Sequence, residues 1–422
     1  MGLKDELLFF LFVPNRPGFL LTATALVILE IVVTYGIIQK IPYTEIDWST
    51  YMQQVECYVK KNEMNYSRIE GDTGPIVYPG GHLIVYRIFY ALTNKGQDIR
   101  VGQYIFMILY LINLISVFRL YSKTRLMPPF VLFLLTCTGY RIHSLFVLRL
   151  FNDTVAMTFL YLALNFFVSQ KWLAGSLLFS AAFSIKMNIF LFAPALGCIL
   201  LLNTGLAWTV LCGLAAGLLQ LYVAFPFILY DPISYIRRSF DLGRVFMFKW
   251  TVNWRFLPEE LFLDNRFHLA LFLTMVLLWA VFGFHMWFRS MGGLRVSFLT
   301  LFRGIRSRTG PGDTLFALFT ANLIGIACAR SLHYQFYSWY YHQLPLLLFF
   351  NYPLPTSDDE KFPIPWKSII AKTCVLLAVE VCWCTYPSTN ISSLALHVIH
   401  FGILFYLVRT RESHKRKHYK LY

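Results

Sequence analysis

The feature that most constrains how this chain can fold is a series of long apolar segments that recurs from residue 18 to residue 408. A helix needs about 20 predominantly apolar residues to cross the hydrocarbon core of a bilayer. The composition agrees, because only 14% of the residues are charged, whereas a soluble domain uses about 25% to cover its surface. The sequence therefore predicts an all-α, polytopic membrane protein, with residues 1–422 forming one multi-pass membrane domain.

The spans are expected wherever an apolar segment lies between polar connections. Their number is about twelve, an even number that places both termini on the same side of the membrane. The expected spans are 18–38, 99–121, 127–141, 153–170, 172–185, 189–203, 207–229, 267–288, 313–329, 343–352, 368–384 and 394–408.

The distribution of charge predicts which side each connection faces. Two long loops, about 39–98 and 230–266, are nearly balanced in charge, whereas basic residues dominate the connection at about 289–312 and the tail 409–422. Basic connections stay in the cytosol, so both long loops are expected on the other side, with interfacial helices within them. The net charge of +15 comes from these connections and not from a basic, aromatic-lined surface, so no nucleic-acid partner is expected.

Three N-x-[ST] sequons agree with this orientation. Asn65, Asn152 and Asn390 all fall on the non-cytosolic side of the predicted topology, where such sites can be glycosylated. Asn152 lies so close to the predicted membrane boundary that its modification is not expected.

Asp47 follows the first expected span directly and should lie at the depth of the lipid headgroups. A carboxylate at that depth suits a base that works on a lipid-linked substrate. The structural alternative is a capping box from Thr44 to Asp47, in front of an interfacial helix whose apolar face includes Trp48, Met52 and Val55. Both interpretations remain open on the residues alone.

The segment Gly71–Gly81 is dense in turn-forming residues and contains Asp72 and Tyr78. A loop of this kind can bring backbone N–H groups against a ligand. It can equally be a plain turn, in which the Asp72 side chain accepts a hydrogen bond from the backbone two residues later.

Six cationic side chains near predicted non-cytosolic ends of spans are candidates to hold a lipid phosphate. Basic side chains at membrane ends often only extend toward water, and Arg149 is also placed for a helical ion pair with Asp153, four residues later. Lys186 and Arg330 are the stronger candidates, because a charge in an apolar neighbourhood is costly to keep. The six are Arg141, His143, Arg149, Lys186, Arg330 and His333.

The run from Ala329 to His342 is rich in both aromatic and polar residues. Tyr and Trp are expected in an interfacial belt. The belt does not require Arg330, His333, Gln335 and His342 among them, and aromatic faces beside hydrogen-bond donors also suit a sugar.

A transporter or lipid scramblase is the alternative from another functional class. Such proteins commonly carry charged residues at the midplane of paired, broken helices. Only Glu30 and Glu380 come near the predicted midplane, and neither has an obvious partner in the sequence. The polar residues gather instead on one side, which favours chemistry at a membrane surface.

Five sequence strings in one order resemble a known family between about residues 40 and 350. The family is that of the dolichyl-phosphate-mannose-dependent alpha-1,3-mannosyltransferases of N-glycan precursor assembly. The strings are Glu45-Ile46-Asp47-Trp48; Gly71-Asp72-Thr73-Gly74-Pro75 with Tyr78-Pro79; His143 to Asp153; Ser184-Ile185-Lys186-Met187-Asn188; and Arg330 to Tyr340.

The resemblance implies a GT-C type glycosyltransferase in the endoplasmic reticulum membrane, with its active site in the lumen. Such an enzyme moves mannose, with inversion, from dolichyl-phosphate mannose to the five-mannose lipid-linked oligosaccharide. The substrates and membrane lipid are the expected partners, and no metal or other cofactor is expected. A sister transferase with another acceptor or a glucose donor is the alternative among enzymes, and the sequence carries no feature that predicts an oligomeric state.

The resemblance also implies roles for individual residues. Asp47 maps to the acidic base of the first lumenal loop. The predicted donor-phosphate ligands are Lys186, Arg330, His333 and Arg149. The predicted substrate contacts are Trp48, Asp72, Tyr78, Asn188, Tyr334 and Tyr337.

Overall fold

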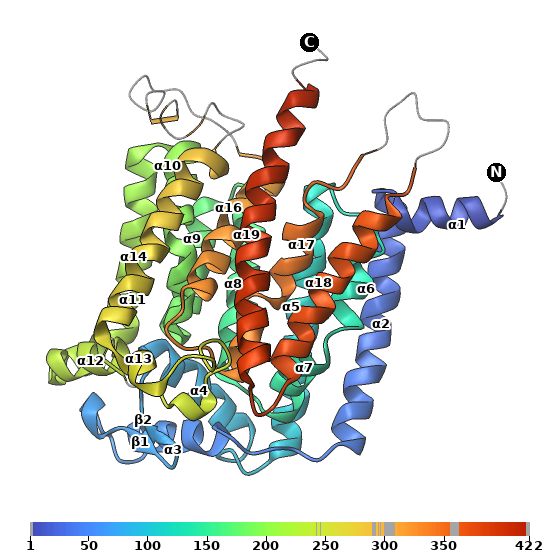
Figure 1. Ribbon diagram of the computed structural model, residues 1–422. Coiled ribbons are helices and arrows are strands. Elements are labelled where there is room, and N and C mark those ends of the chain that lie inside the picture. Colours follow the sequence, from blue (N-terminus) through green and yellow to red (C-terminus); the bar gives the residue numbers. More distant parts are fainter. Residues whose placement is uncertain are drawn as a thin grey trace.

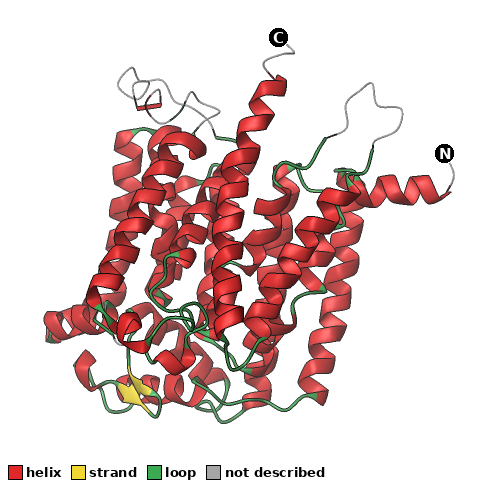
Figure 2. Cartoon of the chain, viewed as in Figure 1, coloured by secondary structure: helices red, strands yellow, loops and turns green. Residues whose placement is uncertain are grey.

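The computed structural model describes residues 3–418 except 242, 245, 289–292, 294, 296, 299–308 and 355–362. In these residues helices dominate, and the strands form one two-stranded hairpin (Figure 2). The longer helices are α2 (Arg16–Lys40), α5 (Ile99–Thr124), α8 (Asn152–Val168), α9 (Trp172–Ile185), α10 (Ala193–Thr204), α11 (Leu206–Tyr230), α14 (Asn265–Phe282), α16 (Pro311–Ala327), α18 (Trp366–Cys384) and α19 (Asn390–His418).

The shorter elements connect or cap these helices. They are α1 (Leu3–Phe12), α3 (Trp48–Val59), β1 (Glu70–Gly71), β2 (Gly74–Pro75), α4 (Gly80–Leu92), α6 (Val131–Thr136), α7 (Tyr140–His143), α12 (Pro232–Ser239), α13 (Glu259–Leu263) and α17 (Leu344–Phe349). The basic connection at about 289–312 lies largely outside the described residues, as do residues 419–422 of the tail.

Six helices in the described part of the chain are long and apolar enough to span a membrane, or up to seven if one bent pair counts as a single span. The predicted number of about twelve is therefore not confirmed. The segment expected to span at 127–141 is instead divided into α6 and α7, with Gly139 between them, and the one expected at 343–352 holds only the six-residue α17. In both places the apolar run lacks a long uninterrupted helix.

Two helices show the membrane character of the fold most clearly. Only 22% of the apolar window of α11, and 11% of that in the segment Asn265–Trp287, which begins with α14, is buried inside the protein. Leu218 and Leu229 of α11 are 65% and 70% exposed. Exposed apolar surface of this extent is unfavourable in water, so these helices face lipid. The predicted all-α polytopic membrane protein is confirmed.

The two long loops lie at the same end of the helix bundle (Figure 1). The loop at 39–98 forms α3, the hairpin and α4, and the loop at 230–266 forms α12 and α13. The partly helical loops expected from the sequence are thus present. We call this end the Asp47 end. Helix α1 and the C-terminal part of α19 lie together at the opposite end.

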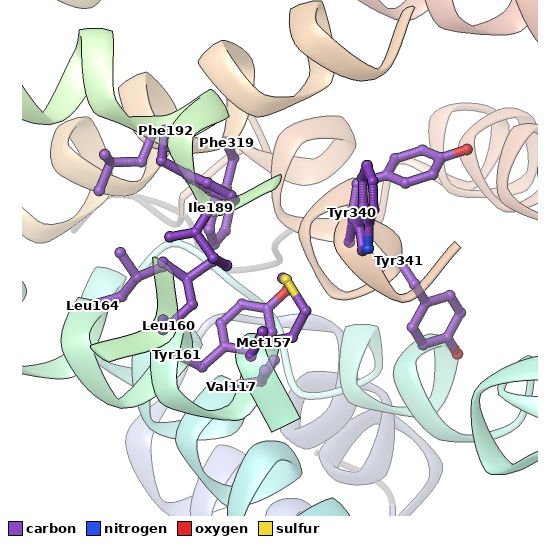
Figure 3. Close-up of a cluster of buried hydrophobic side chains, with 14 of the residues drawn as sticks. Val117, Met157, Leu160, Tyr161, Leu164, Ile189, Phe192, Phe319, Tyr340 and Tyr341 are labelled. Carbon is purple, nitrogen blue, oxygen red and sulfur yellow. The ribbon is translucent and has the colours of Figure 1, made fainter. Parts of the chain in front are cut away.

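Helix α8 lies at the centre of the bundle, packed against α5 and α9. Fourteen of its 17 residues are buried, so α8 is surrounded by protein on nearly all sides. Figure 3 shows part of this core, where side chains of α8 meet those of α5, α16 and the turn that follows α9: Val117, Met157, Leu160, Tyr161, Leu164, Ile189, Phe192 and Phe319. The burial of α8 matters because its first turn carries part of the candidate site.

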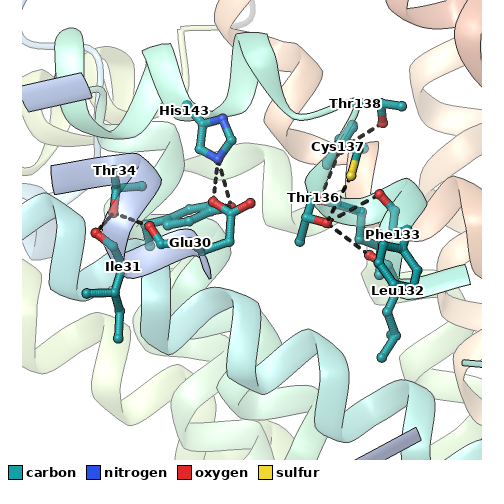
Figure 4. Close-up of polar contacts among 12 residues, drawn as sticks. Glu30, Ile31, Thr34, Leu132, Phe133, Thr136, Cys137, Thr138 and His143 are labelled. Carbon is teal, nitrogen blue, oxygen red and sulfur yellow. Dashed lines mark hydrogen bonds and ion pairs between the residues drawn. The ribbon is translucent and has the colours of Figure 1, made fainter. Parts of the chain in front are cut away.

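Glu30 has partners that the sequence did not reveal. Its carboxylate lies 2.6 Å from the His143 ring and accepts a 3.0 Å hydrogen bond from Tyr110 (Figure 4). Burying a carboxylate is costly unless it is paired and hydrogen-bonded, and the contact joins α2 to α5 and α7. The expectation that Glu30 lacks a partner was wrong, and His143 is engaged in this cluster and does not join the candidate site.

Candidate active site

Asp47 immediately precedes α3, but it does not cap that helix through its side chain. Glu45 does so instead, by accepting a 3.1 Å hydrogen bond from the Ser49 backbone N–H. The Thr44 backbone N–H donates to Leu148 at 3.0 Å, so Thr44 does not begin the helix either. The capping box predicted from Thr44 to Asp47 was therefore wrong. The Asp47 carboxylate is left available for another purpose.

The glycine-rich loop supplies the main contact to Asp47. Its first part is a hairpin in which Gly71 pairs with Gly74, leaving Asp72 and Thr73 in the turn. The Thr73 hydroxyl lies 3.1 Å from Asp47 Oδ1 and 2.9 Å from the Thr50 hydroxyl. A Cβ atom on Gly71 would lie 2.9 Å from Thr50 Cα, so only glycine allows the hairpin to sit this close to α3.

The environment of Asp47 favours a basic carboxylate. Partial burial raises the pKa of Asp47 above its usual range, and the charge of Asp153 acts in the same direction, whereas Lys186 and the Thr73 hydrogen bond oppose the rise. The Tyr51 hydroxyl also donates a long, weak hydrogen bond of 3.4 Å to the Asp47 carboxylate. A partly buried carboxylate with a raised pKa is a typical general base.

Lys186 lies close enough to Asp47 to affect its pKa, and is itself held by the first turn of α8. Its ammonium donates to Asn152 Oδ1 at 2.9 Å and to Asp153 Oδ2 at 2.6 Å. Asp153 is fully buried and its other oxygen accepts a 2.5 Å hydrogen bond from the Trp339 indole. The two polar segments of residues 141–153 and 184–188, which the sequence placed on the same side of the membrane, therefore meet.

A sharp bend between two helices brings these segments together. The helical segment ending at Leu148 and the start of α8 are bent by 108° relative to each other, and Leu150 between them has a left-handed backbone with φ of 50°. Arg149 and Asp153 are consequently not on one continuous helix. The predicted ion pair between them was wrong, since Asp153 pairs with Lys186 and Arg149 contacts the Ser144 hydroxyl.

Aromatic rings line the Lys186 ammonium. Tyr78 lies 5.4 Å and Phe336 5.5 Å from it, ring centroid to nitrogen. The Phe336 ring also stacks on His333, with 5.4 Å between the ring centroids, so the predicted ligands Lys186 and His333 share one aromatic neighbour. Cations over aromatic faces keep part of their stabilisation when water is excluded.

Arg330 and Arg244 lie over one aromatic ring, that of Phe246, at 4.9 and 5.5 Å from its centroid. His333 approaches the same ring edge-on at 5.3 Å. Burial and the neighbouring cations lower the pKa of His333 to about 4, so His333 is neutral near pH 7. It can offer a hydrogen bond to a phosphate, but not the positive charge that the sequence suggested.

Asn188 is buried near Lys186, with its side-chain oxygen lacking a partner in the described residues. Tyr334 donates to the Thr385 carbonyl at 2.9 Å and lies under Arg141, whose guanidinium carbon is 4.9 Å from the ring centroid. Both residues stay candidate substrate contacts, although the structure joins Tyr334 to the start of the α18–α19 connection more closely than to Asp47.

Three other predicted contacts are placed unfavourably for a direct role. Trp48 is 1% exposed and its indole donates to the Gly96 carbonyl at 3.0 Å. Tyr337 is 2% exposed and stacks on Trp383. Asp72 is exposed but is tied to Gln53, whose amide donates to it at 2.7 Å, and not to its own backbone. We interpret Trp48 and Tyr337 as packing residues of the site.

Sequence reasoning did not single out Thr73, Asn152 or Trp339 as parts of this site. Thr73 stood within a recognised string, but nothing in its type marks it as a partner of Asp47. Asp153 was considered only as a partner of Arg149. Its burial could not be inferred because the chain reverses direction between Leu148 and Asn152.

Comparisons with known proteins place the chain in a family. The family described as ALG3 protein matches residues 24–393. The Dol-P-Man:Man(5)GlcNAc(2)-PP-Dol alpha-1,3-mannosyltransferases of Mus musculus and Homo sapiens are 44% and 45% identical, over 93% and 92% of this chain and 88% and 86% of theirs. The enzyme of the same name from Arabidopsis thaliana is 40% identical over 90% of this chain and 86% of its own.

No solved structure matches the chain. The family match covers far more than half of the sequence, and each of these relatives shares at least 40% of its aligned residues with it. The resemblance identified from the five strings is therefore confirmed: the chain belongs to the ALG3 protein family.

Proposed function

We propose that this chain transfers mannose from dolichyl-phosphate mannose, in alpha-1,3 linkage, to Man5GlcNAc2-PP-dolichol, giving Man6GlcNAc2-PP-dolichol. The names of its relatives support the reaction. The single observation that supports it from the structure is the partly buried Asp47 carboxylate, which does not cap α3 and is close enough to Lys186 for the lysine to lower its pKa.

Asp47 acts as the base in this proposal. It takes the proton from the acceptor hydroxyl while that oxygen attacks the anomeric carbon of the donor mannose from the face opposite the phosphate. The bond from the anomeric carbon to the phosphate oxygen breaks with its electron pair, and dolichyl phosphate leaves. A leaving group that is already an anion needs no protonation, so one carboxylate suffices where a glycosidase requires two.

Positive charge near the leaving phosphate stabilises the transition state. Lys186 and Arg330 are the proposed sources of this charge at the Asp47 end, with the neutral His333 as a hydrogen-bonding partner. Arg149 is a more distant candidate, because its described contact is to Ser144. Asn188, two residues after Lys186, and Tyr78, whose ring lies beside the Lys186 ammonium, are proposed to contact the sugar.

We place the reaction at the lumenal face of the endoplasmic reticulum membrane, and we propose that it proceeds without a metal ion. The placement rests on the balanced charge of the two loops at the Asp47 end and on the basic tail at the other. Protease treatment of sealed microsomes tests it. A C-terminal tag should be digested without detergent, and a protected tag would reverse the orientation.

Transfer by the purified protein tests the reaction itself. Dolichyl-phosphate mannose and Man5GlcNAc2-PP-dolichol, with a chelator present, should yield one product with an added alpha-1,3-linked mannose. Transfer from dolichyl-phosphate glucose, or only to a different lipid-linked acceptor, would favour a sister transferase. Flipping of lipid-linked sugars across vesicles without transfer would favour a scramblase.

A further inference from the structure

The first turn of α8 contains a buried polar atom that the described residues do not satisfy. Asn152 is fully buried, and its Nδ2 atom has no partner in the part of the chain that the structure describes. A buried amide nitrogen without a partner is rare in native structures and calls for a ligand or a water. The side-chain oxygen of the same residue is already used by Lys186.

Lys186 has an unused N–H donor beside Asn152. An ammonium group has three N–H donors, and its described hydrogen bonds use two of them, to Asn152 and Asp153. The lysine is only 8% exposed, so the remaining donor has little access to water. Together with the Asn152 amide nitrogen it leaves two donors unused at this place, whereas the acceptors of Asn152 and Asp153 are engaged and the nearby Asn188 oxygen is an acceptor without a partner in the described residues.

The backbone adds to this preference for an anion. Helix α8 begins directly after the break at Leu150, and its N-cap residue Phe151 provides no side-chain hydrogen bond. The N-terminus of a helix carries partial positive charge and N–H groups directed outward. Asp153 is fully engaged by Lys186 and Trp339, so its own charge is compensated within the protein.

We propose that the first turn of α8 is the subsite for the donor phosphate, in which the Asn152 amide and Lys186 donate to phosphate oxygens and Asp153 is a positioning residue that fixes Lys186. The inference rests on the proposed function for the identity of the donor. It adds Asn152 to the ligands expected from the sequence, adds Asp153 as a positioning residue, and makes Lys186 the central cation of the subsite.

Binding of dolichyl phosphate, which has the phosphate but no mannose, tests the Asn152 part directly. Asn152→Ala should weaken equilibrium binding of dolichyl phosphate by about tenfold or more, as expected for losing a hydrogen bond to a charged group. Asn113→Ala is the matched control, because Asn113 is 1% exposed and also has unpartnered side-chain atoms but lies on α5. Its binding should be unchanged.

The outcomes separate this inference from the proposed function. If wild-type protein transfers mannose and Asn152→Ala binds dolichyl phosphate normally, the subsite is wrong and the function stands. If wild-type protein binds dolichyl phosphate but transfers nothing, the function fails while the subsite can still pass its own test. Equal loss in Asn152→Ala and Asn113→Ala would indicate a general packing defect and overturn the subsite.

The pH dependence of transfer tests the positioning role of Asp153. The groups that act on Asp47 are Lys186, Asp153, Tyr51 and Thr73. Asp153→Asn removes a negative charge that raises the pKa of Asp47. That pKa should therefore fall, and the acid limb of the pH–rate profile should move to lower pH. Lys186→Met removes a positive charge, so the limb should move to higher pH.

The charge of Asp153 acts on Asp47 whatever its role, so a purely structural role would be seen as a lower amount of folded protein without a change in the KM for dolichyl-phosphate mannose. Asp153→Asn should also raise the KM for dolichyl-phosphate mannose more than it lowers kcat at saturating donor, because Lys186 is no longer held in place. An unchanged pH profile together with an unchanged KM in the folded variant would overturn the positioning role.

Discussion

The Gly81→Ala substitution should disturb the packing of α4 against α9, and with it the position of Lys186. Gly81, at the start of α4, faces the end of α9, where a Cβ atom would lie 2.0 Å from Ser184 Oγ, 2.6 Å from Ser184 Cβ and 2.9 Å from the Ser184 carbonyl oxygen. Ordinary van der Waals contact begins near 3.4 Å. Because one of the three atoms is backbone, the serine cannot relieve the clash by rotating its side chain alone.

The two helices must therefore move apart by roughly 0.5 to 1.4 Å at this contact, and Lys186 is only two residues beyond Ser184. A misplacement of about 1 Å in a catalytic site can cost on the order of 100-fold in rate, and overpacking typically costs about 1–3 kcal/mol of stability. We expect Gly81→Ala to fold with a lower Tm and to transfer mannose roughly 100-fold more slowly in single-turnover reactions.

Two further variants make this reasoning refutable. Adding Ser184→Gly to Gly81→Ala removes the two closest side-chain atoms and should recover part of the rate. Gly213→Ala on α11 is the control, because its new Cβ would meet nothing within 4 Å. Wild-type transfer by Gly81→Ala, or no recovery in the double variant, would show that this contact does not set the site geometry.

Other substitutions test single contacts. Thr73→Val removes a hydrogen bond that lowers the pKa of Asp47, so the acid limb of the rate should move to higher pH, and an unmoved limb would refute the contact. Glu30→Leu leaves the polar atoms of His143 without their carboxylate partner, so unfolding in detergent should show a loss of about 1–3 kcal/mol; undiminished stability would be inconsistent with the cluster. Asn152 should carry no glycan in the native protein, since it is fully buried, and mass spectrometry of the tryptic glycopeptides checks this.

Much of the helical architecture could be predicted from the sequence, because a membrane helix is specified by local apolar composition. The span expected at 207–229 is α11 at Leu206–Tyr230, and the one expected from 99 begins where α5 begins. Local composition fails where an apolar run is interrupted but still buried, as between α6 and α7. There the apolar residues are divided between two short helices packed within the bundle, which composition alone does not indicate.

The site was predictable only in part, for the same physical reason. Asp47 could be named because it directly follows the first expected span and matches the family's acidic residue, and Lys186 because a charge beside apolar residues is costly to keep. Their partners could not, since the Lys186 to Asp153 contact joins residues 33 apart and the rule for ion pairs on one helix indicates Arg149 instead. The role of Gly81 was also hidden, because a glycine that permits close helix packing looks the same in sequence as one that permits a turn.

Single-turnover mannose transfer by Asp47→Asn, at saturating donor and acceptor, tests the central claim most directly. Asparagine keeps the size of the side chain and removes the base, so the rate should fall by roughly 100- to 10,000-fold, with expression and dolichyl-phosphate binding retained. Glu45→Gln is the matched control, because Glu45 lies two residues earlier and caps α3, and it should stay within a few-fold of wild type. A rate above about a tenth of wild type for Asp47→Asn would contradict its role as the base.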